Sequence, residues 1–280
     1  MNNQQNPIFT VVIPVLNEEY FLPRLLNDLK KQTLQNFEVI VVDGKSEDAT
    51  IEKSQIYSAY FPLRIVGTEK RNVSFQRNMG ARLGTGLFLI FLDADTRIQK
   101  TFTKKLHKYI EAEKGLIFLP YVEPEDKSTE VVAFYQLLNF LISKSQGSTN
   151  PYSSVGGMIW EKNFFHLLGG FDEDQFVAED FHIVKKASDW GVKGKFMQNI
   201  KITFSFRRIN NEGKLQSLYK MLLTGFYRMF KGEIKEKIFS YEMQGGKYHI
   251  DNNRKETFDK KVAIFFKRTG KQIEEFLTFK

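Results

Sequence analysis

Short apolar runs alternate with stretches of helical periodicity along the first hundred residues of the chain. The runs are typical of buried strands because they are rich in Val, Ile, Leu and Phe and are bounded by polar residues. They cover residues 9–14, 37–42, 63–66 and 88–92. Helices are expected between them, from Asn17 or Glu18, over 46–58, and from Ser74 to about Leu83. This alternation predicts an α/β chain with a doubly wound, mostly parallel sheet flanked by helices.

The second half of the chain continues this pattern and then changes character. We expect helices over 101–114 and 129–143, strands over 115–121 and 156–160, and an exposed loop over 145–154. From Leu215 to Phe230, apolar residues recur at helical spacing among lysines and arginines, which predicts an amphipathic helix. The chain therefore divides into an α/β domain, 1–210, and a helical C-terminal extension, 211–280. That extension could pack on the sheet, pair with another subunit or lie on a membrane surface.

The composition limits the chemistry that the chain can perform. It has no cysteine, which excludes a thiolate nucleophile, a disulfide and a cysteine zinc site. Its 41 Lys and Arg against 33 Asp and Glu give a net charge of +8, which suits an anionic partner. No recognised nucleic-acid motif accompanies this charge, so we expect no specific nucleic-acid partner. No secretory signal or membrane span is recognisable, which predicts a cytoplasmic protein, at most peripheral on the inner face of the membrane.

Two carboxylates stand directly after the strand predicted over 88–92. Asp93 and Asp95 would lie at the carboxyl end of that strand, where open α/β sheets bind their ligands. Paired carboxylates there suit a hard divalent cation, which in turn would bind a diphosphate. The alternative is a solvated turn, since Asp and Thr are ordinary turn residues.

Five motifs give the chain a resemblance to a known enzyme family. They are VVIPVLNEE (11–19), VVDGKSEDAT (41–50), QRNMGA (76–81), DAD (93–95), and GGFDE (169–173) followed by AEDF (178–181). In this order and spacing they resemble family 2 glycosyltransferases of the GT-A fold, which move a sugar from a nucleotide-sugar donor with inversion at the anomeric carbon. The resemblance covers about residues 8–190. It implies a nucleotide-sugar half at about 8–100 and an acceptor half at about 101–210.

The same resemblance implies roles for the donor-side residues. The backbone around Pro14 and Leu16, together with Glu18 and Asp43, would hold the nucleoside of a nucleotide-diphosphate sugar. Arg77 would approach the diphosphate. A positively charged side chain beside the two phosphates would suit the charge that they carry.

Metal-binding and catalytic groups follow from the resemblance as well. Asp95, with Asp93 close by, would anchor Mg²⁺ or Mn²⁺ on the two phosphates. Asp180 would be the base that takes the proton of the acceptor hydroxyl, and Glu179 is the second candidate for that role. From residue chemistry alone, Glu179 and Asp180 could instead open a helix, where acidic residues complement the helix dipole.

Two features leave the substrates open. Arg207 and Arg208 belong to an SFRR element (205–208) that resembles one meeting donor phosphates in some family members, although on a basic chain such arginines are often surface charges. Gly44 stands where many members have a second Asp, so the nucleotide is not assigned. The acceptor is unknown: the amphipathic segment Leu215–Phe230 favours a lipid-linked or otherwise apolar acceptor, and a glycan is the other possibility.

Two other functions are compatible with the sequence. The chain could be a catalytically silent GT-A-fold member that serves as a binding or membrane-recruitment module. It could also be a sugar nucleotidyltransferase, which would share the sheet and a metal-binding carboxylate. That enzyme class normally has a Gly-rich phosphate loop after the first strand, whereas residues 14–18 contain no glycine.

Overall fold

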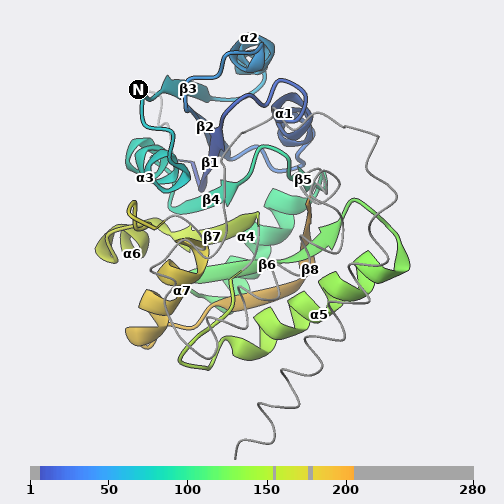
Figure 1. The fold of residues 1–280 in the computed structure, drawn as a ribbon, viewed down its shortest axis with the longest axis vertical. Helices are drawn as coiled ribbons and strands as arrows, with labels where there is room; N and C mark the ends of the chain where they lie inside the picture. Colours follow the sequence, from blue (N-terminus) through green and yellow to red (C-terminus); the bar gives the residue numbers. More distant parts are fainter. Residues whose placement is uncertain (1–6, 154–155, 176–178, 205–280) are drawn as a thin grey trace, which may run out of the picture.

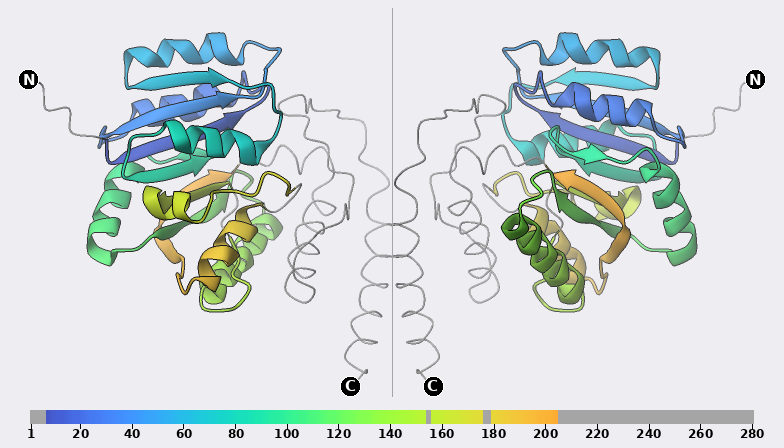
Figure 2. Two further views of the ribbon diagram at one scale, coloured as in Figure 1. Left: turned by 90° about the vertical axis from the view of Figure 1, so that its left-hand side faces the viewer. Right: turned by 90° about the vertical axis from the view of Figure 1, so that its right-hand side faces the viewer.

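The computed structural model describes residues 7–153, 156–175 and 179–204, which form an eight-stranded sheet with helices packed against it (Figures 1 and 2). Across the sheet, the strands are β3 (Leu63–Gly67), β2 (Phe37–Asp43), β1 (Phe9–Val15), β4 (Phe88–Leu92), β7 (Gly157–Glu161), β6 (Ile117–Pro124), β8 (Lys195–Phe204) and β5 (Arg97–Ile98). Strands β7 and β5 run antiparallel to their neighbours, while the other pairs are parallel. The predicted doubly wound, mostly parallel sheet is therefore confirmed.

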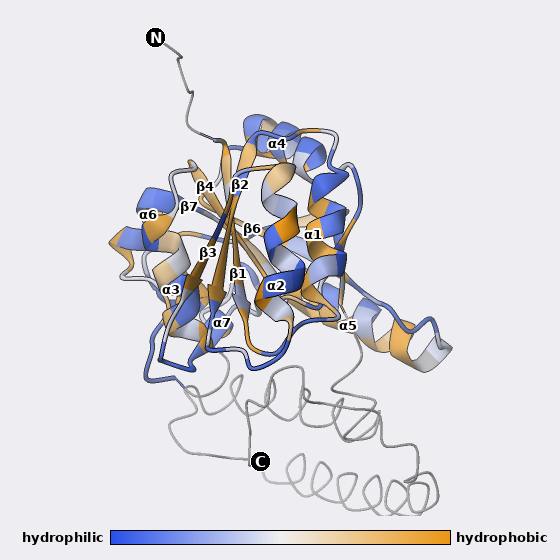
Figure 3. Cartoon of the chain, turned by 90° about the horizontal axis from the view of Figure 1, so that it is seen from above, coloured by the Kyte–Doolittle hydropathy of each residue, from blue (hydrophilic) through white to orange (hydrophobic). Residues whose placement is uncertain are grey.

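Helices cover both faces of this sheet. They are α1 (Leu22–Lys30), α2 (Thr50–Gln55), the 3₁₀ helix η1 (Ile56–Ala59), α3 (Val73–Leu83), α4 (Phe102–Glu113), α5 (Thr129–Ser145), α6 (Lys162–Leu167) and α7 (Glu179–Asp189). Figure 3 shows α1 and α3 on opposite faces of the parallel half. None of the helices in the described ranges combines the length and the apolar composition that crossing a lipid bilayer requires.

The four strands predicted in the first hundred residues are present, and the first is longer than expected. The sequence pattern placed its end at Pro14, but β1 continues to Val15. Pairing between β1 and β4 stops at Val12, so beyond that point only β2 continues alongside β1. Pro14 therefore lies at the open end of the β1–β4 ladder, where a missing N–H is tolerated.

Helix starts differ from the sequence predictions. Helix α1 begins at Leu22 rather than at Asn17 or Glu18, because the intervening residues form a turn. Helix α3 is capped by Asn72, whose side chain accepts a hydrogen bond from the Phe75 N–H (2.8 Å), and not by Ser74. The Ser74 hydroxyl is instead buried without a hydrogen-bond partner among the described residues. The helix predicted over 46–58 is divided into α2 and η1.

Other differences concern the second half of the chain. The two-residue strand β5, the short helix α6 and the strand β8 were not delimited by the sequence pattern. The loop predicted as exposed over 145–154 is exposed at 147–149 but buries Gln146 and Ser153. The predicted C-terminal extension lies outside the described residues.

Helix α3 packs unusually close to β1 because Gly80 has no side chain. A Cβ added at Gly80 would lie 2.3 Å from Cγ1 of Val12, which is far inside van der Waals contact. Gly80 sits in the QRNMGA motif, one turn after the residues of α3 that reach the carboxyl edge of the sheet. The absence of a side chain at this position therefore sets how near α3 can come to that edge.

We expect Gly80→Ala to lower the free energy of unfolding by about 1–3 kcal/mol, the usual cost of overpacking a core. Urea unfolding followed by circular dichroism measures this loss. Gly67→Ala is the matched control, because a Cβ at Gly67 meets nothing within 4 Å, and it should change stability by no more than about 0.5 kcal/mol. Equal effects of the two substitutions would refute the close-packing argument.

Candidate active site at the carboxyl edge of the sheet

The turns that follow β1 and β2 are bonded to each other at the carboxyl edge of the sheet. The Gly44 N–H donates to the Val15 carbonyl (2.9 Å), and the Asn17 N–H donates to Ser46 Oγ (2.8 Å). The Asn17 side chain in turn accepts from the Glu47 N–H (2.8 Å). Asn17 has a φ of 55°, a left-handed conformation that Asn adopts more readily than most residues. The two turns therefore form one preorganised rim.

Two acidic residues are buried within this rim. The Glu18 N–H donates to Thr50 Oγ1 (2.7 Å), which anchors Glu18 against the first turn of α2. Asp43, at the last position of β2, accepts hydrogen bonds from both the N–H and the hydroxyl of Ser46. Its carboxylate thus holds the shape of the turn that follows it.

The side chain of Gln76 on α3 links the ends of β1 and β2. Its Nε2 donates to the carbonyls of Val15 (2.9 Å) and Val42 (2.8 Å), and its side chain is buried. A Cβ at Gly44 would lie 3.1 Å from this same Nε2. The amide of Gln76 therefore occupies the space beside Gly44, which gives the glycine at this position a structural reason.

Arg77, the next residue of α3, is the shared partner of three carboxylates. Its Nη2 lies 2.7 Å from Asp93 Oδ1, and its Nη1 lies 2.8 Å from Glu179 Oε1 and 2.9 Å from Asp180 Oδ1. The guanidinium also lies over the ring of Phe171, 5.3 Å from its centroid. The Arg77 side chain is only 6% exposed, so it joins the end of β4 to the start of α7 inside the protein.

The electrostatics of this cluster follow from three carboxylates sharing one guanidinium, that of Arg77. Burial alone would lower the pKa of Arg77, but the neighbouring carboxylates more than offset burial and raise it. Burial disfavours the charged form of Asp180, and Glu179 and Asp93 repel it further, so the pKa of Asp180 is raised to about 8 despite Arg77. One guanidinium is thus shared by three carboxylates, and the pKa of Asp180 is the one that their repulsion raises.

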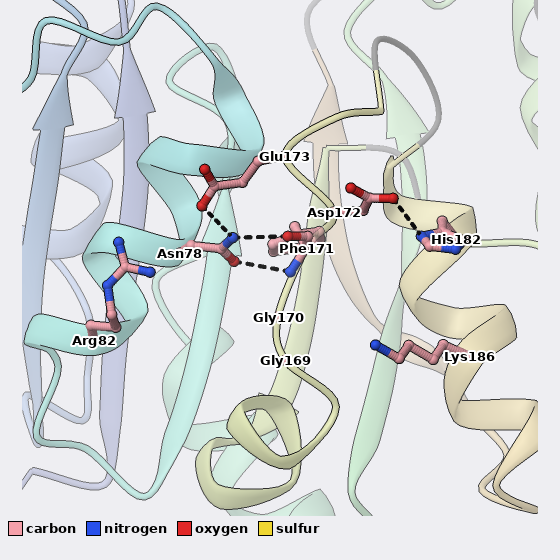
Figure 4. Close-up of a pocket in the computed structure, with 9 residues that line it drawn as sticks. All are labelled: Asn78, Arg82, Gly169, Gly170, Phe171, Asp172, Glu173, His182 and Lys186. Atoms are coloured by element: carbon pink, nitrogen blue, oxygen red, sulfur yellow. Dashed lines mark hydrogen bonds and ion pairs between the residues drawn. The ribbon is translucent and has the colours of Figure 1, made fainter. Parts of the chain in front are cut away.

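Asn78 holds the GGFDE segment against α3. Its side chain accepts from the Phe171 N–H (2.9 Å) and donates to the Phe171 carbonyl (2.8 Å), as a neighbouring strand would (Figure 4). Gly170 has a φ of +74°, and a Cβ there would lie 2.5 Å from Asn78 Oδ1. Glycine is therefore required at this contact for both conformation and space.

A pocket of about 370 Å³ lies between α3 and α7, on the outer side of this segment (Figure 4). Asn78 and Arg82 line it from α3, His182 and Lys186 line it from α7, and residues 169–173 lie between them. Its walls thus carry charges of both signs and adjoin the helix that begins with Glu179 and Asp180.

Asp95 lies in the turn after β4, and its charge affects the pKa of Tyr135 on α5. Tyr135 is buried on α5, and burial together with the charge of Asp95 raises the pKa of the Tyr135 hydroxyl. Sequence reasoning missed Tyr135 because nothing in the local pattern distinguishes it from a core aromatic residue.

The residues at this edge suit a divalent cation that is bound jointly by protein carboxylates and by the phosphates of a substrate. Among the described residues, no group of three or more His, Asp or Glu side chains is arranged to hold a metal ion by itself. Asp93 and Asp95 offer carboxylate oxygens one residue apart on a half-exposed turn, and Arg77 engages only Oδ1 of Asp93. Mg²⁺ is usually bound by one or two carboxylates together with substrate phosphates, so two carboxylates match that donor set.

The structure brings together most of the residues singled out in the sequence. Pro14 is buried in β1 and Leu16 is half-buried in the turn after it, beside Glu18 and Asp43. Arg77 joins the donor-side Asp93 to the acidic pair on α7, an arrangement that the sequence did not predict. Arg207 and Arg208 lie outside the described residues.

The chain is similar to known glycosyltransferases. Residues 10–166 match the model of glycosyl transferase family 2. An uncharacterized glycosyltransferase from Haemophilus influenzae is 30% identical over 200 residues, which is 64% of this chain and 61% of that protein. The poly(ribitol-phosphate) beta-N-acetylglucosaminyltransferase TarS from Staphylococcus aureus is 30% identical over 190 residues, covering 64% of this chain and 32% of TarS. The chain thus spans less than two thirds of the length of these relatives.

Solved structures agree on the fold. TarS residues 1–349 in complex with UDP-GlcNAc match with a TM-score of 0.59 at 23% identity, over 70% of this chain and 58% of that chain. The mannosyltransferase PcManGT from Pyrobaculum calidifontis, in complex with GDP-Man and Mn²⁺, matches with a TM-score of 0.60 at 19% identity, over 79% and 65%. The predicted GT-A fold is thereby confirmed. Because the family model covers more than half of its residues, the chain belongs to glycosyl transferase family 2.

Proposed function

We propose that this protein transfers a sugar from a nucleotide-diphosphate sugar to an acceptor hydroxyl, with inversion at the anomeric carbon. The observation that carries the proposal is the buried Arg77, which links Asp93 to the acidic pair Glu179 and Asp180. An inverting transfer needs a charge-stabilised leaving diphosphate on one side of the sugar and a base on the other. The cluster places acids from β4 and α7 on either side of one guanidinium.

The donor-side roles rest on the preorganised rim. The turn containing Pro14, Leu16 and Glu18 would receive the nucleoside, and Asp43 would keep the neighbouring turn in shape through its bonds to Ser46. Such rims at the carboxyl ends of parallel strands are where open α/β sheets bind nucleotides. Arg207 and Arg208 remain predicted phosphate contacts.

Asp95, together with Asp93, would hold Mn²⁺ or Mg²⁺ against the two phosphates of the donor. The cation would supply positive charge to the departing diphosphate. PcManGT, a structural neighbour, is solved with GDP-Man and Mn²⁺, and TarS with UDP-GlcNAc. These neighbours use different nucleotides, so the proposal assigns a nucleotide-diphosphate sugar without naming the base.

Asp180 would take the proton as the acceptor oxygen bonds to the anomeric carbon and the bond from that carbon to the diphosphate breaks. It lies on the first turn of α7, and its carboxylate is positioned by Arg77 (2.9 Å). Glu179 shares the same Nη1 and is the alternative base. A lipid-linked or glycan acceptor, and a cytoplasmic location at the inner face of the membrane, stay predictions.

A donor-binding experiment tests the proposal directly. Thermal unfolding in the presence of UDP, GDP, TDP or CMP, each with and without Mn²⁺, should show stabilisation by one nucleotide that depends on the metal. At a hundredfold excess over Kd, binding adds about 2.7 kcal/mol, which corresponds to a shift of several degrees. Asp95→Ala should abolish the shift, while Asp189→Ala, an exposed change on α7, should keep it. Metal-independent stabilisation of Asp95→Ala would contradict the assigned metal site.

We expect Asp180→Asn to lower kcat at least about 10²- to 10⁴-fold, the range that a positioned general base contributes. Asn keeps an oxygen that can accept from Arg77, so the melting temperature should change little. The assay is sugar transfer, or donor hydrolysis where no acceptor is supplied. Asp189→Asn on the same helix serves as the control. Full activity in Asp180→Asn together with its loss in Glu179→Gln would move the base to Glu179, and no turnover by the unmodified chain would favour a silent binding module.

The raised pKa of Asp180 predicts a distinct pH profile. A base acts only when ionised, so kcat/KM should be low below about pH 8 and rise as the pH passes through that value. Glu179→Gln removes a neighbouring negative charge, lowers the pKa of Asp180 and should shift the rising limb to lower pH. Glu111→Gln, far away on α4, should leave the profile unchanged. If kcat/KM rose at the same pH in Glu179→Gln as in the unmodified chain, the titrating group would not belong to this cluster.

A further inference from the structure

Helix α5 carries apolar side chains on its outer face as well as on its inner face, and that outer face also carries Gln136 and Lys144. Its inner face buries Val131, Tyr135, Leu138 and Ile142 against β6 and β8. Its outer face exposes Leu137 (49%) and Phe140 (56%), with Ala133 exposed and Phe134 and Leu141 half-buried beside them. Large apolar side chains gathered on an exposed face normally mark a contact surface. The outer face of α5, defined by these five residues, therefore calls for a second covering element.

The chain itself leaves the described structure next to this helix. Strand β8 ends at Phe204, which pairs with Pro124 at the end of β6, and the Phe204 carbonyl accepts from the Glu125 N–H (3.1 Å). Residue 125 precedes the start of α5 at Thr129 by four positions. The 76 residues from 205 to 280 thus begin beside the N-terminal end of α5.

We propose that the segment Leu215–Phe230 of this same chain docks on the outer face of α5. Leu215 follows Phe204 by eleven positions, which can span roughly 36 Å, more than the length of about 25 Å that α5 has. Wound as a helix, the segment is about 24 Å long and matches α5 in length. The assignment stands independently of the proposed sugar transfer.

The distribution of residues in the segment suits this contact. At 100° per residue, seven of its apolar side chains fall within one arc: Leu215, Leu218, Leu222, Leu223, Phe226, Met229 and Phe230. Met221 falls outside that arc. Lys214, Lys220, Arg228 and Lys231 fall within the opposite arc. Docking would cover Leu137 and Phe140 with apolar side chains and leave the basic residues in water.

The surroundings of α5 favour this occupant over a membrane or a second copy. Helix α5 itself carries two charged residues, Glu130 and Lys144, so its outer face has a single lysine rather than the basic rim of an interfacial helix; Glu123, Glu125, Asp126 and Lys127 precede it. A face about 25 Å by 10 Å is also far smaller than the roughly 800 Å² per partner of a stable dimer. An intramolecular segment can use so small a face because its effective concentration is high.

The natural absence of cysteine makes a disulfide test clean. Leu137→Cys is combined in the full chain with Leu218→Cys, Leu222→Cys or Phe226→Cys, and oxidation is followed by mass spectrometry of the monomer. We expect an intramolecular disulfide with at least one of these partners, formed at least tenfold faster than with Lys220→Cys or Thr224→Cys on the opposite arc. Leu167→Cys on α6, which replaces a leucine that is more exposed than Leu137 (65% against 49%), should not cross-link to the same partners.

Hydrogen exchange gives a second readout that needs no cross-link. Amides of residues 215–230 should exchange at least tenfold faster in a Leu137→Glu, Phe140→Glu double variant than in the unmodified chain, and Leu167→Glu should leave them unchanged. Disulfides that form only between two chains would assign the face to a second copy. Protection that appears only with vesicles of anionic phospholipid would assign the segment to a membrane. Equal cross-linking from both arcs, or an unprotected segment under all conditions, would also overturn the proposal.

Discussion

One buried guanidinium determines how this active edge is assembled. The Arg77 side chain is only 6% exposed, so its charge must be met by protein groups, and it pairs with three carboxylates from two separate parts of the chain. Those carboxylates equally depend on Arg77, because a buried acid without a counter-charge would be expelled or neutralised. The ion pairs of Arg77 therefore hold the turn after β4 and the start of α7 together. Any substitution that removes one of these side chains leaves the remaining charges buried without a counter-charge, which is destabilising.

Helix α3 extends this control to the whole edge. Gln76, Arg77 and Asn78 are consecutive, so their side chains leave the helix in three directions 100° apart. Gln76 bonds the ends of β1 and β2, Arg77 bonds the acids, and Asn78 bonds the segment before α7. The missing side chain of Gly80 lets α3 lie close to Val12, which brings these three side chains within bonding distance of their partners. A polar motif on one helix thereby fixes the register between the donor-side turns and the acidic pair.

Sequence reasoning found the parts of this arrangement but not their connections. Strands β1, β2 and β4 of the parallel half were predictable because they are largely buried and read as apolar runs, and β3, a half-exposed edge strand, was recognisable from its short apolar run alone. Strand β5, with two residues, is too short to carry a pattern, and β8 mixes polar and apolar positions around a bulge opposite Pro120. Arg77 lies 16 residues from Asp93 and 103 from Asp180, so their pairing depends on topology. The same holds for Tyr135, whose pKa the charge of Asp95 raises although the two residues are 40 positions apart in the sequence.

The sign of the charge at this edge explains why a cation belongs in the proposed reaction. The chain carries a net charge of +8, yet Asp93, Glu179 and Asp180 outnumber Arg77 within the cluster, and Glu18 and Asp43 lie in the adjoining rim. Among the described residues near the rim, three cations are paired with acids: Lys45 with Glu69, Lys70 with Glu173 and Arg71 with Glu47. A bare diphosphate would therefore meet a largely acidic surface in the described part of the chain. In the proposed reaction, a divalent cation between Asp95 and the phosphates would offset that repulsion, which the overall basic charge of the protein would not do locally.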